Sequence, residues 1–97
     1  MPDPIDLEEH AKQGKAVPDR AAAYRIKIDK EVFVVEVPSM TGRELLQLAK
    51  KLPPEKYNLY EIIRGKPIKV ALDETEQFSK QGLEKFKTLP LDQTEGD

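Results

Sequence analysis

The residues with the clearest chemical potential stand at the end of this 97-residue chain, where Gly96 precedes a final Asp97. Glycine has no side chain, so its backbone can approach another group closely and turn freely. Its carboxylate, once exposed, could therefore enter a narrow active site as an acyl donor, and Asp97 would block that reaction until it was removed. The six residues from Leu91 to Gly96 reach about 20 Å when fully extended. The residues expected to thread into partner enzymes are Leu91, Asp92, Gln93, Thr94 and Glu95.

The residues before this tail predict the elements that hold it. Period-two alternation predicts a strand at 24–28 and a second strand at 31–37, joined through Asp29-Lys30 as a hairpin. The side chains expected to face the core from these strands are Tyr24, Ile26, Ile28, Phe33, Val35 and Val37.

A helix is expected to follow, because Thr41 and Glu44 have the spacing of a capping box. Proline at positions 53 and 54 is expected to end it. The apolar residues that fall on one face of this helix are Leu45, Leu48, Ala49 and Leu52.

Three further strands are predicted, at 57–63, 68–72 and 83–89. A polar connection at 73–82, anchored by Phe78, separates the last two, and Gly82 marks a turn. Either Tyr60 and Ile62 or Leu59 and Ile63 face the core, and the pattern leaves this choice open.

This order of elements predicts an α+β chain with the β-grasp fold. One main helix would pack across a mixed sheet of four to five strands, with the first and last strands in its middle. The expected organisation is a flexible polar arm at 1–20, a domain at 21–90 and a flexible tail at 91–97. The arm has few large apolar residues to offset its ordering entropy, although Asp6 and Glu9 could cap a short helix.

Composition excludes several classes of function. The chain has no cysteine, so no disulfide framework, thiolate metal site or cysteine nucleophile is expected. The single histidine, His10, lies in the polar arm, and the acids Asp73, Glu74 and Glu76 are expected to form a solvated loop rather than a metal site. Net charge is −2, with thirteen basic against ten acidic residues in 21–90, too small a surplus to indicate nucleic-acid binding. Neither a signal peptide nor a membrane span is apparent, so a cytoplasmic protein is expected. No serine or threonine has a base nearby in sequence, so the chain is not expected to be an enzyme itself, and no cofactor is expected.

Apolar residues on the outer side of the predicted sheet form a candidate docking patch. If Phe33 and Val35 point inward, Val32 and Val34 point outward, and Ile63 is the third candidate member.

At three segments the chain resembles bacterial ubiquitin-like proteins of the multi-ubiquitin domain family. The segments are Tyr24 to Asp29 with the strand that follows it, Thr41 to Leu45, and Gly82 to Pro90. The resemblance implies a ubiquitin-like protein modifier that works with an activating enzyme, a conjugating-enzyme homologue and a metallopeptidase of the JAB type. It implies that the peptidase trims the chain after Gly96, and that the exposed carboxylate is adenylated and transferred to a target protein.

Two alternatives remain beside the modifier. One is a β-grasp interaction module that binds partners without being conjugated. The other is a sulfur carrier, which ranks last because this tail has Glu95-Gly96 rather than a terminal pair of glycines.

Overall fold

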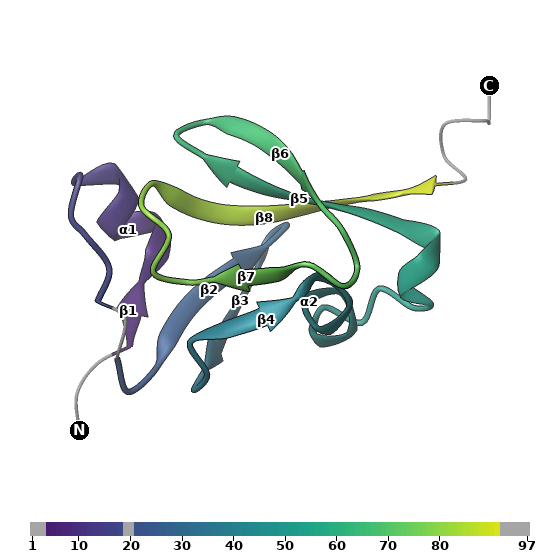
Figure 1. The fold of residues 1–97 in the computed structure, drawn as a ribbon, viewed down its shortest axis with the longest axis horizontal. Coiled ribbons are helices and arrows are strands. Elements are labelled where there is room, and N and C mark those ends of the chain that lie inside the picture. Colours follow the sequence, from purple (N-terminus) through teal and green to yellow (C-terminus); the bar gives the residue numbers. More distant parts are fainter. Residues whose placement is uncertain (1–3, 19–20, 92–97) are drawn as a thin grey trace.

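The computed structural model describes residues 4–18 and 21–91 of the chain. The elements run in the order β1 (Ile5–Asp6), α1 (Leu7–Lys12), β2 (Tyr24–Ile28), β3 (Glu31–Val35), β4 (Ser39–Thr41), α2 (Gly42–Leu48), the 3-10 helix η1 (Pro54–Lys56), β5 (Tyr57–Ile63), β6 (Lys66–Val70), β7 (Thr75–Gln77) and β8 (Leu83–Pro90). Figure 1 shows α1 at one end of the molecule and the C-terminal end of β8 at the other.

The main sheet is mixed, and β2 and β8 lie in its middle. β2 pairs with β3 in antiparallel orientation and with β8 in parallel orientation. β8 pairs in antiparallel orientation with β5, which in turn pairs with β6. The predicted β-grasp arrangement, with the first and last strands of the domain at the centre, is therefore confirmed (Figure 1).

The hairpin of β2 and β3 forms where the alternation predicts it. Ile26 is opposite Phe33 in the register, and Tyr24 is opposite Val35. Asp29, at φ 57°, reverses the chain between the strands. The expectation that Val37 faces the core is wrong, because β3 ends at Val35 and Val37 lies in the bend beyond it, 44% exposed.

Helix α2 begins with the predicted capping box. The Glu44 amide donates to the Thr41 hydroxyl, and the Glu44 carboxylate accepts from the Thr41 amide. The helix ends at Leu48, about one turn before the prolines, so Leu52 lies beyond it and is 58% exposed rather than facing the core. The buried face instead includes Leu46, which is fully buried with Leu45.

A small second sheet joins the segment just before α2 to the connection between β6 and β8. β4 pairs in antiparallel orientation with β7, inside the segment expected to be a polar connection. Gly42 allows this close packing, because a Cβ atom there would lie 2.4 Å from the carbonyl oxygen of Ala71. Short polar strands of three residues carry little alternation, which is why the pattern did not predict them.

Residues 4–18 correct the expectation of a flexible arm. β1 pairs in parallel with the start of β2, and α1 follows with Asp6 as its N-cap, as the spacing suggested. Leu7 is fully buried and Val17 is 8% exposed. The polar composition misled the prediction because strand pairing and a few well-placed apolar side chains, chiefly Leu7, hold this segment to the body without a large apolar face.

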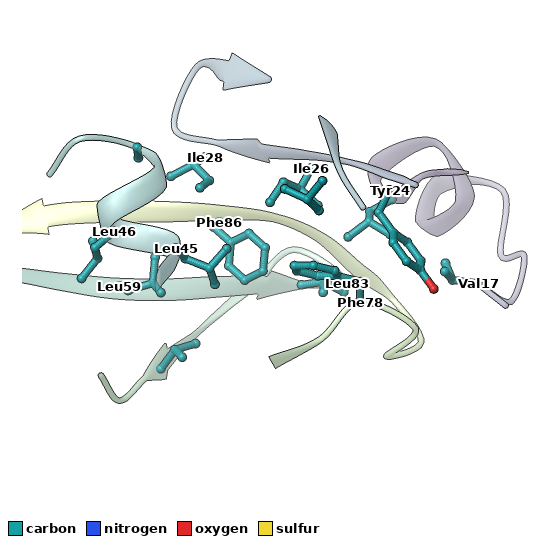
Figure 2. Close-up of a cluster of buried hydrophobic side chains, with 14 residues drawn as sticks. Val17, Tyr24, Ile26, Ile28, Leu45, Leu46, Leu59, Phe78, Leu83 and Phe86 are labelled. Atoms are coloured by element: carbon teal, nitrogen blue, oxygen red, sulfur yellow. The ribbon is translucent and has the colours of Figure 1, made fainter. Parts of the chain in front are cut away.

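The core contains a row of three aromatic rings. Phe78 lies between Tyr24 and Phe86, with ring centroids 5.6 Å and 6.5 Å away (Figure 2). Phe78 thus anchors the connection between β6 and β8, as predicted, and it does so directly beside both central strands.

Candidate functional site

The candidate site is the end of the chain, and β8 is the element that positions it. β8 pairs with β5 along its length, from Leu83 opposite Ile63 to Pro90 opposite Tyr57. On its other edge it pairs with β2, where Phe86 is opposite Ile28. A central strand held on both edges is a rigid base for whatever follows it.

A side-chain contact fixes the last part of β8 further. The backbone amide of Thr88 donates to Asp29 Oδ1 at 2.9 Å, and the Thr88 hydroxyl donates to Asp29 Oδ2 at 2.6 Å. Lys51 Nζ lies 3.9 Å from the same carboxylate. Asp29 therefore ties the turn between β2 and β3 to the strand that carries the tail, two residues before β8 ends.

The first residue of the tail is the only one of its seven that the structure describes. Leu91 follows β8, is 38% exposed and lines a hollow of about 260 Å³ beside β5 and β6. The remaining predicted site residues, Asp92, Gln93, Thr94, Glu95, Gly96 and Asp97, lie outside the described residues, so their roles stay predictions.

Of the three residues predicted for the docking patch, two lie on the outer face of the sheet and one does not. Val32 and Val34 are 55% and 53% exposed on the outer face of the sheet, as expected. Ile63 packs against the core instead, on the same side of β5 as the buried Leu59. The open choice for 58–63 is thereby resolved: Leu59 and Ile63 face inward, and Tyr60 lies on the outer face with Ile62.

A buried acidic cluster lies on that inner side, where sequence reasoning missed it. Glu61 of β5 is 3% exposed and Glu76 of β7 is 1% exposed. Lys80 Nζ donates to both oxygens of Glu61 at 3.0 Å and to Glu76 Oε1 at 3.1 Å. Glu76 is therefore not part of a solvated loop, although its expected neighbours Asp73 and Glu74 are exposed.

The pKa values of Glu76 and Lys80 in this cluster are shifted from their ordinary values. Burial raises the pKa of Glu76 to about 7, and its hydrogen bond with Glu61 raises it too, which outweighs the opposing effect of Lys80. Burial alone would lower the pKa of Lys80, but its hydrogen bonds with the two carboxylates raise it above the usual value. The signal for Glu61 was available, because strand alternation places it between the inward-facing Leu59 and Ile63.

Other candidate groups remain simple structural features. Nδ1 of His10 lies 3.1 Å from the Asp6 carbonyl oxygen within the first turn of α1. Arg64 and Gly65 have positive φ and form the turn between β5 and β6. Within residues 4–18 and 21–91, no cluster of histidine and acidic side chains has the arrangement of a metal site. In the same residues no helix is long and apolar enough to cross a membrane.

The sheet order, the single crossing helix and the central C-terminal strand define a ubiquitin-like β-grasp protein. A family model described as "Multiubiquitin" matches residues 24–90, from the start of β2 to the end of β8. The chain belongs to the multiubiquitin family. No curated protein and no solved structure matches it.

Proposed function

We propose that this chain is a ubiquitin-like protein modifier that is conjugated through the carboxylate of Gly96. The observation that carries the proposal is the position of β8, which is central in the sheet, is tied to Asp29 and leads directly into the glycine-containing tail. Membership of the multiubiquitin family supports the same reading. The body would serve as a rigid recognition unit, and the tail as the part that partner enzymes act upon.

The chemistry would proceed in three steps on partner enzymes. A JAB-type peptidase hydrolyses the amide between Gly96 and Asp97 and releases aspartate. The Gly96 carboxylate then attacks the α-phosphate of ATP, which forms an acyl adenylate and releases pyrophosphate. An enzyme nucleophile displaces AMP, and the acyl group passes through a conjugating enzyme to a nucleophile on the target protein.

Glycine at the reacting position fits this chemistry for a steric reason. An acyl donor without a side chain can be approached from either side, and its backbone can take dihedral angles that other residues avoid. Asp97 would place a negative charge next to the group that must meet ATP. Its removal would therefore activate the chain.

Mass spectrometry of the reaction mixture tests this proposal. The full chain is incubated with the peptidase, the activating enzyme and ATP, and the expected result is loss of Asp97 followed by an ATP-dependent adduct at Gly96. A chain ending at Gly96 is the matched control, because it should form the adduct without the peptidase. A Gly96→Ala chain that still forms the adduct would rule out the tail mechanism.

The exposed valines favour a second candidate, an interaction module that binds without conjugation. Val32 and Val34 are large apolar side chains left in solvent on one edge strand. In this case a partner would bind equally to the full chain and to a chain lacking 92–97, and Val32→Lys would abolish binding. Absence of any adduct together with that binding pattern would favour the module over the modifier.

A further inference from the structure

The outer face of the main sheet is basic: its paired strand residues include no acid, and the acidic Glu84 of β8 lies at the register shift between Leu83 and Lys85. Strand registers and alternation place one set of side chains from β2, β3, β5, β6 and β8 on this face, opposite the buried set. Its members are Arg25, Lys27, Val32, Val34, Asn58, Tyr60, Ile62, Pro67, Lys69, Lys85, Lys87 and Leu89. We call this set the outer face; it joins five positive charges to several apolar side chains.

The N-terminal segment already places carboxylates on one side of the outer face. Asp6 lies 3.9 Å from the Arg25 guanidinium, and Glu8 lies 4.0 Å from Lys27 Nζ and 3.8 Å from Lys85 Nζ. The outer face therefore attracts acidic side chains of this same chain, and β1 with α1 neutralises Arg25 and Lys27 of β2 and Lys85 of β8.

The other side of the outer face keeps its charge. Lys69, Tyr60 and Lys87 form a row across β6, β5 and β8, because Tyr60 is opposite both lysines in the registers. Two strand spacings separate the lysine backbones, about 10 Å. Within residues 4–18 and 21–91, no carboxylate forms an ion pair with either lysine. Next to this row is a groove of about 490 Å³, but Asp29 and Glu84 line it beside Lys85 and Lys87, so its charge is mixed.

We propose that this row of Lys69, Tyr60 and Lys87 binds the acidic segment 92–97 of a second copy of the chain. That segment carries Asp92, Glu95 and Asp97 and no basic residue, so its charge is opposite to that of the row. In a polyproline II conformation, Asp92 and Glu95 would lie on one side about 9 Å apart, which matches the separation of Lys69 and Lys87. Tyr60, between the lysines, offers an apolar surface against which an extended backbone can lie.

A second copy suits the row better than the chain's own tail. To fold back from Leu91 along β8, the chain would need a reversal of about three or four residues. That reversal would use Asp92 and leave only Glu95 and Asp97 to meet the lysines. A tail from another copy can approach in extended form and present all three carboxylates. This inference concerns self-recognition and stands independently of whether Gly96 is ever conjugated.

Fluorescence anisotropy with a labelled peptide of residues 91–97 tests the proposal without ATP or any enzyme. The peptide is titrated with a chain that lacks 92–97, so that no tail competes for the site. We expect saturable binding that weakens as salt is added. The double variant Lys69→Glu/Lys87→Glu should weaken it about tenfold, because two exposed ion pairs are replaced by repulsion.

Matched controls separate this site from general attraction between charges. Lys15 and Lys56 are exposed and off the outer face, so Lys15→Glu/Lys56→Glu makes the same change in net charge and should leave binding nearly unaltered. A peptide with Asp92→Asn, Glu95→Gln and Asp97→Asn should not bind. Three results would each overturn the proposal. They are an equal loss of peptide affinity in the two double variants, binding of the neutral peptide as tightly as the acidic one, and no binding of the acidic peptide at all.

Sedimentation of the full chain distinguishes the second copy from the chain's own tail. Association that increases with concentration, and disappears when 92–97 are removed, is the expected result. A full chain that stays monomeric at high concentration while excluding the labelled peptide would show the tail bound to its own body, and would overturn the second-copy proposal. Because neither measurement uses peptidase or ATP, failure here is distinct from failure of the conjugation chemistry.

Discussion

At the residue scale, the most consequential side chain near the candidate site is Thr88. It is 8% exposed, and both its amide and its hydroxyl donate to Asp29, which is 59 positions earlier in the chain. Such a contact joins the hairpin of β2 and β3 to the strand that leads into the tail. Hydrogen bonds to a charged acceptor are stronger than those between neutral groups, so this contact should contribute measurably to the free energy of unfolding.

Thr88→Val tests that contribution. Valine keeps the shape of threonine but removes the hydroxyl donor, so we expect the free energy of unfolding to fall by about 1.5 kcal/mol. Urea denaturation measures the change. Thr75→Val, at an exposed position of β7, is the control and should change stability by less than about 0.5 kcal/mol. Equal effects in the two variants would mean that the Asp29 contact adds nothing.

Glu76 makes stability depend on pH near neutrality. Its pKa is about 7 in the folded chain against an ordinary value of 4.5, so between these values the folded state holds a proton that the unfolded state releases. The resulting stabilisation is complete below 4.5 and is lost as pH rises through about 7. Glu76→Gln replaces the protonated carboxyl by a neutral amide, so the free energy of unfolding should depend less on pH. At about pH 8 this variant should have a free energy of unfolding higher than the parent's by on the order of 2 kcal/mol.

Thermal unfolding at several pH values between about 5 and 8 measures this effect. Glu74→Gln is the matched control: Glu74 lies two residues before Glu76 but is exposed, so its replacement should leave the pH profile as it is in the parent. A parent chain whose stability is flat across this range would show that Glu76 ionises normally despite its burial.

At the scale of elements, alternation and capping were sufficient to predict most of the fold. The period-two spacing of Tyr24, Ile26 and Ile28 is enough to predict a half-buried strand. The Thr41–Glu44 capping box correctly predicts where α2 begins. The same local signals could not predict β4 and β7, because strands of three residues are stabilised by pairing rather than by their own pattern. Nor could they place residues 4–18, because the order of this segment depends on the packing of α1 against β2 and β8.

Leu7→Ala tests whether that N-terminal segment belongs to the folded body. Leu7 is fully buried within the core cluster, so truncation should lower the free energy of unfolding by about 3 kcal/mol. Leu52→Ala makes the same chemical change at an exposed position and should cost less than about 0.5 kcal/mol. If Leu7→Ala is as mild as Leu52→Ala, the segment is a detachable arm, as its composition first suggested.

At the scale of the whole molecule, the proposed function assigns stability and reactivity to different parts of the chain. The family match covers residues 24–90, the same stretch that runs from the first central strand to the end of the last. Strand pairing of β8 ends at Pro90, and the residues that would react come after it. The candidate site could be predicted from sequence only as a tail behind a fold, because the proposed chemistry would take place on partner enzymes.

Removal of residues 92–97 tests this division. Because every strand pair and the aromatic row lie before Leu91, a chain ending there should keep its free energy of unfolding within about 0.5 kcal/mol, measured at low protein concentration. The same chain should form no adduct with the activating enzyme, whereas a chain ending at Gly96 should form it fully. Gly96→Ala should leave stability unchanged and form no adduct. A loss of more than about 1 kcal/mol on removing the tail would mean that it packs on the body, and a rigid base carrying a separate reactive end would then be the wrong description of this molecule.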